Sequence, residues 1–323
     1  MSARQRELWI KFNIVLKHFA SGANCIEKIK MHVGLVHALR HFKRRRLILF
    51  RAYFIYILPY LSKSLEISQK YRILLNHYSF IKQQFSFTHL CILFAGGIEC
   101  YHEVTDAKDK YSIFLKSVRN HLEAEGSMNL LFKLNGTVLF TLGFTFAPGY
   151  IFNLDDSQII YVSSIQGTKN QHENIKAATK YFKDNAIPAM LLKALETIAG
   201  LMHINTCICI SVNDQLAFKD KSTYDRFYNN YDAFWMNSGA TFLNDNYILD
   251  LPLKQKPILE ISQPHRNRTL KKRKKIQNVC DVIADYMRPI LEENGENTSV
   301  EAEVIRGDYP MAHEWTDLAI RKS

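Results

Sequence analysis

Two apolar segments joined by two helical patterns form the clearest feature of the chain. Residues 158–165 and 205–212 are continuous apolar runs of strand length. Between them, residues 171–182 and 188–202 carry apolar positions at helical spacing, and Pro188 suits the first position of a helix. Such a connection normally makes the two strands parallel neighbours. The pattern therefore predicts a strand–helix–helix–strand crossover unit.

Upstream of this unit, the hydrophobic period changes to two. Residues 128–134 and 137–146 alternate as strands, and Asn135-Gly136 between them favours a type I′ hairpin turn. Turn residues follow at Pro148-Gly149, before the strand at 158. The middle of the chain is therefore predicted to be an antiparallel meander that leads into the crossover unit.

The remaining segments give a mixed picture. Residues 7–80 have helical patterns, residues 106–121 are predicted to form an amphipathic helix, and residues 87–94 fit either a strand or a short buried helix. Asn170 and Glu173 have capping-box spacing. Further elements are expected at 246–251, as a strand or loop, and at 276–287, as a helix.

These elements predict an α+β fold, with a helical N-terminal region followed by a mixed β-sheet flanked by helices. We divide the chain into a basic helical region at 1–82, an α+β core at 83–290 and a polar C-terminal tail at 291–323.

Charge is unevenly distributed over the 323 residues, whose formal net charge is +11. Residues 1–80 contain 15 Lys or Arg and 3 Asp or Glu, whereas residues 81–323 contain 27 and 28. A basic segment of this kind suggests an anionic partner such as RNA or acidic membrane lipid, or an acidic protein. Two clusters are the candidate contacts: Lys43, Arg44, Arg45 and Arg46, and then Arg266, Arg268, Lys271, Lys272 and Arg273. The second cluster also fits a solvated helix face, because no nucleic-acid-binding motif accompanies it.

Residues 40–58 combine the first basic cluster with an apolar run. The run is shorter than the roughly 20 residues needed to span a bilayer, and Arg51 interrupts it, so no transmembrane span is predicted. The segment fits a buried helix with a charged edge, or a helix that lies on an anionic membrane surface. The second interpretation predicts weak, salt-sensitive association with the inner membrane.

The six cysteines show no spacing typical of a zinc site or a disulfide framework. His172 and His203 also lack metal-ligand spacing, so no metal is expected. The N-terminus does not resemble a secretory signal. We therefore expect a cytoplasmic protein with reduced thiols.

The turn after the first strand of the crossover unit is a candidate binding loop. Gln166, Gly167, Thr168 and Lys169 lie where that strand ends and a helix is about to begin. Backbone N–H groups at such a position suit a phosphate or carboxylate, and Lys169 adds positive charge. An ordinary tight turn is the alternative, since the loop has one glycine.

Several short motifs resemble those of the VirK/YbjX family of enterobacterial proteins over residues 70–290. They are Ser164-Ile165-Gln166-Gly167, Ala178-Thr179-Lys180, Pro188, Leu191-Leu192, Ser211-Val212-Asn213, Tyr231-Asp232-Ala233-Phe234-Trp235, Leu251-Pro252 and the basic stretch 266–275. The resemblance implies a cytoplasmic, virulence-associated accessory factor. Such a factor supports production or localisation of a surface virulence protein, after transcription and through protein or RNA contacts, and it contributes to envelope and antimicrobial-peptide resistance.

The order of elements is also similar to the core of the GNAT acyltransferases. In that fold the corresponding loop binds the pyrophosphate of acyl-CoA, through a Q/R-x-x-G-x-G/A pattern that is replaced here by Gln166-Gly167-Thr168-Lys169. The similarity implies acyl-CoA as cofactor and transfer to an envelope or peptide amine. It makes Tyr224, Tyr228 and Tyr231 candidate general acids, with Asp225 placed to orient the amine. An aromatic cluster that seals the sheet edge is the alternative for these tyrosines. A peripheral membrane assembly factor that uses residues 40–58 is a third function.

Overall fold

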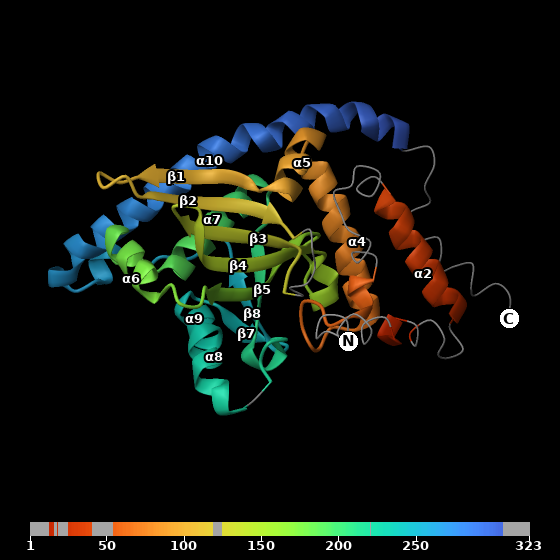
Figure 1. Cartoon of the computed structure of the whole chain (residues 1–323), viewed down its shortest axis with the longest axis horizontal. Coiled ribbons are helices and arrows are strands. Elements are labelled where there is room, and N and C mark those ends of the chain that lie inside the picture. The colour runs from red at the N-terminus through yellow and green to blue at the C-terminus, as the bar shows by residue number, and fades with distance from the viewer. Residues whose placement is uncertain are drawn as a thin grey trace.

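The computed structural model describes residues 13–15, 18, 25–40, 54–118, 125–219 and 221–305. Side chains are described for these residues except 25–27, 221, 226 and 293–305. The described residues form a mixed β-sheet flanked by helices (Figure 1), which confirms the predicted α+β class.

Eight strands within the described residues form one sheet, in the order β1-β2-β3-β4-β5-β6-β8-β7. Their bounds are β1 Ile98–Val104, β2 Lys110–Ser117, β3 Met128–Leu134, β4 Thr137–Ala147, β5 Ile159–Gly167, β6 Thr206–Ile210, β7 Thr241–Leu243 and β8 Asn246–Asp250. β5 and β6 are parallel, and the other neighbouring pairs are antiparallel. The predicted meander and crossover unit are therefore both confirmed.

Helices precede the sheet, connect β5 to β6, and follow β6 and β8. Their bounds are α2 Cys25–Ala38, α4 Ile67–Gln84, α5 Phe87–Ala95, α6 His172–Tyr181, α7 Ile187–Leu201, α8 Tyr224–Asn230, α9 Asp232–Asn237 and α10 Gln263–Ile305. Short 3₁₀ turns span Ile55–Ile57, Gly149–Phe152, Val212–Asp214, Lys221–Thr223 and Ile258–Glu260.

The two faces of the sheet differ in how they are covered. On β3, Leu130 and Phe132 are fully buried, whereas the alternate residues Asn129, Leu131 and Lys133 remain half-exposed. α7 packs against β3, β4 and β5, and α10 packs against α7 and β1, all behind the sheet in the view of Figure 1. Among the described residues, the face that carries Asn129, Leu131 and Lys133 is therefore the less covered one.

The hairpin between β3 and β4 has the predicted turn. Asn135 has a φ of 50° and Gly136 a φ of 82°, so both central residues adopt the left-handed conformation that a type I′ turn requires. The Asn135 side chain accepts a hydrogen bond from the Lys110 backbone N–H at 2.8 Å and donates one to Asp109 at 2.9 Å. These contacts tie the turn to β2.

The helix predicted over residues 106–121 is wrong, because residues 110–117 form strand β2. Ile113 and Leu115 face the core and are at most 1% exposed, whereas Phe114 on the opposite face lies under Lys133. Both faces therefore carry apolar side chains, and the alternation that would indicate a strand is obscured. Residues 119–121 lie outside the described part of the chain.

Other local predictions are refined by the structure. Residues 87–95 form helix α5, whose N-cap Ser86 accepts a hydrogen bond from the His89 N–H. The capping box at Asn170 is wrong: Asn170 has a φ of 61°, and the cap falls at Gln171 without a side-chain bond. Strands β1 and β7 were not predicted, and α10 extends beyond 276–287 at both ends.

The candidate membrane segment 40–58 is described only in part. Residues 41–53 lie outside the described residues, and with them Lys43, Arg44, Arg45 and Arg46. Ile55 and Tyr56, near the end of the segment, are at most 2% exposed and belong to the core. In this part of the segment, the apolar side chains face protein.

Candidate functional site

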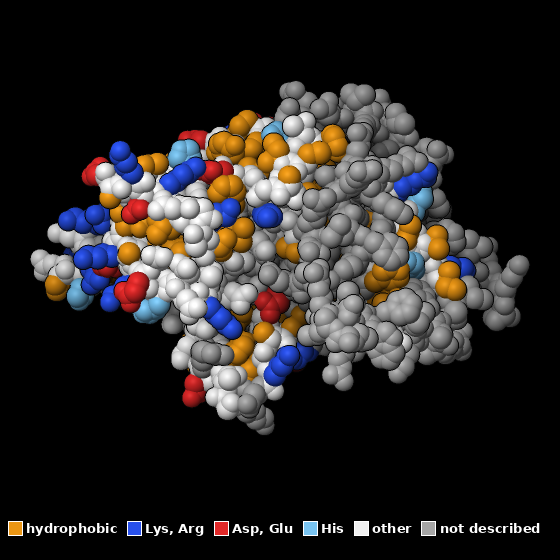
Figure 2. Space-filling model, in the orientation of Figure 1, with side chains coloured by type: hydrophobic (Ala, Val, Ile, Leu, Met, Phe, Trp, Pro, Cys, Tyr) orange, Lys and Arg blue, Asp and Glu red, His pale blue; other side chains and the backbone are white. Residues whose placement is uncertain are grey.

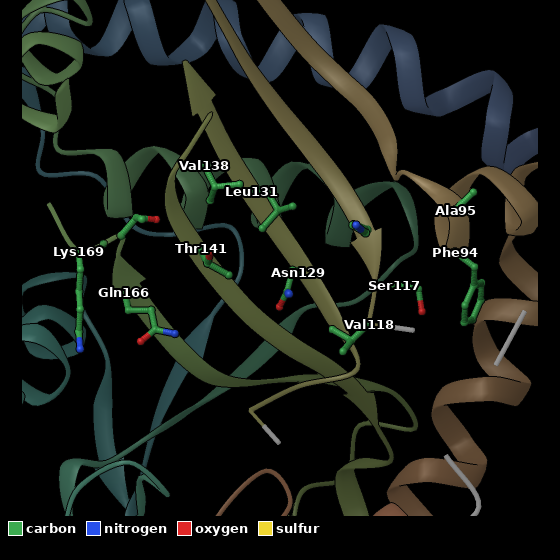
Figure 3. Close-up of a pocket in the computed structure, with 13 residues that line it drawn as sticks. Phe94, Ala95, Ser117, Val118, Asn129, Leu131, Val138, Thr141, Gln166 and Lys169 are labelled. Carbon is green, nitrogen blue, oxygen red and sulfur yellow. The ribbon is translucent and has the colours of Figure 1, made fainter. Parts of the chain in front are cut away.

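A groove of about 700 Å³ crosses the half-exposed face of the sheet. It runs from the loop after β5, over β4 and β3, to the end of β2 and the last turn of α5 (Figure 3). Its lining residues are Phe94, Ala95, Lys116, Ser117, Val118, Asn129, Leu131, Val138, Thr141, Gln166, Gly167, Thr168 and Lys169. All four residues of the predicted binding loop therefore line the groove.

Polar side chains follow the groove from strand to strand. Gln166 on β5 is the register partner of Thr141 on β4, and Asn129 on β3 is the partner of Lys116 on β2. Figure 3 shows Gln166, Thr141 and Asn129 along the groove, with Leu131 beside them. A ligand lying across the strands would meet hydroxyl and amide groups on its path and apolar surface next to them.

Residues 166–169 are exposed, but the prediction that all four form a turn is wrong: Gln166 and Gly167 are the last residues of β5 and pair with Thr141 and Phe140 of β4. Thr168 and Lys169 lead from β5 toward α6, and part of this backbone is already engaged. The Thr168 N–H donates to the Leu139 carbonyl at 2.9 Å. A Cβ added to Gly167 would lie 3.1 Å from the Phe140 ring and 3.3 Å from Ile175. Gly167 therefore allows α6 to approach β4 closely. This packing alone accounts for a glycine at position 167, without a bound ligand. The exposed Lys169 and the N-terminus of α6 are the features of the loop that suit an anion.

The groove is electropositive. Its lining includes Lys116 and Lys169 and contains no Asp or Glu. Outside the groove, on the same face, the Lys133 ammonium lies 3.6 Å from the centre of the Phe114 ring. Burial, together with the nearby charge of Lys116, lowers the pKa of Lys133. Glu99 lies on the same face, raises the pKa of Lys133 through its charge and pairs with Lys110, so the excess positive charge that favours an anionic ligand comes from Lys116 and Lys169 in the groove itself.

The ladder between β5 and β6 is incomplete beside the loop. Pairing covers Ile160 to Val162 on β5 and stops there, although β5 continues to Gly167. Gln215, which is fully buried, donates from Nε2 to the Ser163 carbonyl at 3.2 Å and to the Tyr231 hydroxyl at 3.0 Å. The two strands therefore separate after Val162, and side chains from the segment after β6 occupy the gap.

The predicted catalytic candidates do not line the groove. Tyr231 is 4% exposed, and burial together with the charge of Glu125 raises its pKa to about 12. Tyr224 and Tyr228 stack on each other on α8, with ring centres 5.8 Å apart, and Asp225 is exposed on the same helix. Tyr231 contacts β5 through a hydrogen bond from the Ile165 backbone.

Most of the second basic cluster makes intramolecular contacts. Arg268 pairs with the Asp184 carboxylate at 2.7 Å, and Lys272 donates to the Asp184 carbonyl at 2.8 Å. Arg266 and Arg273 also donate to backbone carbonyls, whereas Lys271 is exposed. Figure 2 shows Lys and Arg side chains gathered where Figure 1 places α6 and the start of α10. These contacts fasten α10 to the turn after α6.

Two further findings concern metal binding and membrane spans in the described residues. Among them, no group of three or more His, Cys, Asp or Glu is placed to hold a metal ion. No helix in the described ranges is both long and apolar enough to cross a membrane.

Comparison with known families extends this picture. The model of a family described as "Protein of unknown function (DUF535)" matches residues 36–282. The chain belongs to this family. DUF535 includes the VirK/YbjX proteins, so the resemblance seen in the short motifs is confirmed at the level of the family. No curated protein matches the chain.

The DUF535 match spans the whole groove, including residues that sequence reasoning did not select. Asn129 and Thr141 lie on the predicted strands β3 and β4, and Lys116 lies on β2, which was predicted as a helix. Alternation along a strand shows which face a residue is on, but it does not show which residues of other strands lie beside it. Gln215 lies just after a 3₁₀ turn and carries no local signal. The register of β2, β3 and β4 brings Lys116, Asn129 and Thr141 together, whereas Gln215 reaches β5 through its side-chain hydrogen bond.

Proposed function

We propose that this chain binds an acyl-CoA-type donor in the groove and belongs functionally with the acyltransferases of GNAT-like fold. The observation that carries the proposal is the position of the loop at 166–169. Gln166 and Gly167 end the last strand of the antiparallel meander, and Thr168 and Lys169 lead from it toward a helix. All four residues are exposed and line the groove, whose lining includes Lys116 and Lys169 and no Asp or Glu. Phosphates of the donor would lie near Lys169 and the start of α6.

The lining of the groove suits the rest of such a donor. The pantetheine arm of CoA is an extended chain with two amide bonds, and Gln166, Thr141 and Asn129 offer donors and acceptors across three adjacent strands. Leu131 and Val138 provide apolar contact for its methylene groups. β5 and β6 separate after Val162, and Gln215 and Tyr231 fill the gap between them. Among the described residues, the end of β5 that leads to Thr168 and Lys169 therefore has no partner strand on the β6 side.

The reaction class that follows from this donor is transfer of the acyl group to an amine of an envelope component or a peptide. The amine nitrogen forms a bond to the thioester carbon, the carbon–sulfur bond breaks, and the proton lost by the amine ends on the thiol of CoA. The groove lining contains no Asp, Glu, His or Tyr to move that proton. The Tyr231 hydroxyl is enclosed by Gln215 and the Ile165 backbone, so we assign Tyr231 to holding β5 in place.

A thermal-shift titration with CoA and acetyl-CoA tests the binding step. The ligand is expected to raise the melting temperature, and Lys169→Glu is expected to weaken binding by about tenfold, because it replaces a charge-assisted contact with repulsion. Lys176→Glu, an exposed lysine on α6 outside the groove lining, makes the same charge change and serves as the control. Absence of any shift at millimolar ligand contradicts the proposal.

Family membership supports a second candidate, the virulence-associated accessory role in surface-protein production and antimicrobial-peptide resistance. The described cysteines are free, which agrees with action in the reducing cytoplasm. A deletion strain tests this role through the amounts of the surface protein and its messenger RNA. Loss of the protein with unchanged message supports action after transcription, and unchanged protein together with unchanged peptide resistance rejects the role.

A further inference from the structure

The groove carries a lysine at each of its two ends. Lys169 follows β5, whereas Lys116 lies on β2, and β4 and β3 run between these strands. The three gaps from β5 to β2 span about 14 Å at roughly 4.8 Å per gap. Figure 3 shows Thr141 on β4 and Asn129 on β3 along the path from Lys169 toward β2. The groove therefore places positive charge at both ends of a polar path.

Lys116 is free to contact a ligand. Its neighbour Leu115 is 1% exposed and faces the core, whereas Lys116 is half-exposed and lines the groove. Lys116 forms no salt bridge with a described residue, and the groove lining contains no Asp or Glu. Glu99, on the same face of the sheet, pairs with Lys110 at 2.6 Å. The Lys116 ammonium is therefore available to an anionic group of a ligand.

Asn129 adds a second hydrogen-bond donor beside Lys116. The two residues are register partners on β2 and β3, and residues opposite each other in an antiparallel pair have Cβ atoms roughly 4.5–5.5 Å apart. Both side chains line the groove. A carboxylate between them can accept hydrogen bonds from the ammonium of Lys116 and from the amide of Asn129 at once.

The length of the groove determines which group of an acyl donor reaches this pair. An extended pantetheine arm that starts from phosphates beside Lys169 would cross β4 and β3, so its thioester would lie near β2. An alkyl end there would gain little, because Phe94, the largest apolar side chain at this end, is 1% exposed and has almost no surface left to cover. A carboxylate in the same place would meet a complementary charge.

We propose that the groove selects acyl donors whose acyl group ends in a carboxylate, such as succinyl or glutaryl, over acetyl and alkyl donors. The inference rests on the proposed acyl-CoA binding and names the substrate class of the same site. Lys116 and Asn129 bind the terminal carboxylate, while Lys169 and the start of α6 bind the phosphates.

Calorimetric titration of the full chain with butyryl-CoA and succinyl-CoA tests the proposal, because both acyl groups have four carbons and differ in ending with a methyl or a carboxylate. We expect succinyl-CoA to bind about fivefold more tightly, and this preference to shrink at high salt because the added contact is ionic. Equal affinities, or tighter binding of butyryl-CoA, overturn the carboxylate inference while acyl-CoA binding stands. Absence of binding by both ligands overturns both.

Substitution of Lys116 provides a second test. Lys116→Met removes the charge, so it should abolish the preference for succinyl-CoA and leave the affinity for butyryl-CoA within about twofold. Lys116→Arg keeps the charge and should keep the preference. Lys176→Met, at an exposed lysine on α6 outside the groove lining, makes the same charge change as Lys116→Met and should also keep it. An unchanged preference in Lys116→Met, or an equal loss of affinity for both ligands, contradicts the proposal.

Discussion

Gln215 donates a hydrogen bond to the Tyr231 hydroxyl at 3.0 Å, in the gap where β5 and β6 separate. The same Nε2 atom donates to the Ser163 carbonyl, and the Gln215 side-chain oxygen accepts from the Ala217 N–H at 2.7 Å. Gln215 therefore replaces part of the missing strand ladder. This buried network keeps β5 extended toward the loop at 166–169 without a partner strand on that edge.

Loss of this network should destabilise the fold. Tyr231→Phe removes the acceptor used by Gln215 and the Ile165 backbone, and should cost about 1–2 kcal/mol, because buried polar groups are left without a partner. Tyr224→Phe, at a side chain that is 37% exposed, should change stability by less than about 0.5 kcal/mol. Urea denaturation compares the two variants. Equal free energies of unfolding would show that the Tyr231 hydroxyl does not support the gap.

Two glycines should respond in opposite directions to alanine. Gly136 has a φ of 82° in the type I′ turn, so Gly136→Ala should destabilise the chain by about 1–2 kcal/mol. Gly200 lies in α7, where an added Cβ has no neighbour within 4 Å, so Gly200→Ala should stabilise it by about 0.5–1 kcal/mol. Thermal unfolding of the pair provides the measurement, and a neutral Gly136→Ala would argue against the turn.

Glu103 anchors α10 to β1 through a network that is sensitive to pH. The Glu103 carboxylate accepts hydrogen bonds from Lys275 at 2.6 Å, from Tyr181 at 2.6 Å and from Tyr101. Burial alone would raise the pKa of Glu103, but these hydrogen bonds outweigh it and lower the pKa below its ordinary value of 4.5. A lowered pKa in the folded state stabilises the fold above the ordinary value, and this contribution is lost as the pH falls through the folded-state pKa.

The stability difference between wild type and Glu103→Gln should therefore be largest near neutral pH and shrink as the pH falls below 4.5 and through the lower folded-state pKa of Glu103. Denaturant midpoints across that range give the measurement. Glu260→Gln, which removes an exposed carboxylate, should show a much smaller difference at every pH. A Glu103→Gln difference that does not change with pH would mean that the network adds no charge-dependent stability.

The contacts of the basic cluster on α10 predict unequal effects for equal changes of charge. Arg268→Met with Lys272→Met removes both contacts to Asp184 and should lower the free energy of unfolding, by a small amount because the ion pair is exposed. Lys271→Met with Lys274→Met removes the same charge from exposed positions and should cost less than about 0.5 kcal/mol. If the cluster instead binds RNA, the two double variants should weaken salt-dependent RNA binding equally and should have equal free energies of unfolding.

The sequence was most informative where one local signal dominates. The alternation around Asn135-Gly136 and the long apolar runs predicted β3, β4, β5 and β6, because a tight turn and strong periodicity are properties of neighbouring residues. β2 was predicted wrongly as a helix because Phe114 is covered by Lys133, so apolar residues occur on both faces of the strand. Periodicity alone does not show which residues a second strand or a long side chain will cover.

The candidate site was predictable only at its loop. Residues 166–169 follow a recognisable strand and precede a recognisable helix, whereas Asn129 and Thr141 join them through the register of the sheet. Tyr231 was selected for its chemistry, but its environment depends on Gln215 and on the early end of the β5–β6 ladder. The contact with Gln215 and the end of the ladder depend on tertiary packing. They place Tyr231, the expected proton donor, away from the groove.

The most direct test of the account is a crystal structure of the full chain with a non-hydrolysable acyl-CoA analogue. We predict that the phosphates lie beside Lys169 and the N-terminus of α6, and that the arm crosses β4 and β3 past Thr141 and Asn129. An analogue bound elsewhere on the chain while this groove holds only water would contradict the assignment of the groove as a donor site.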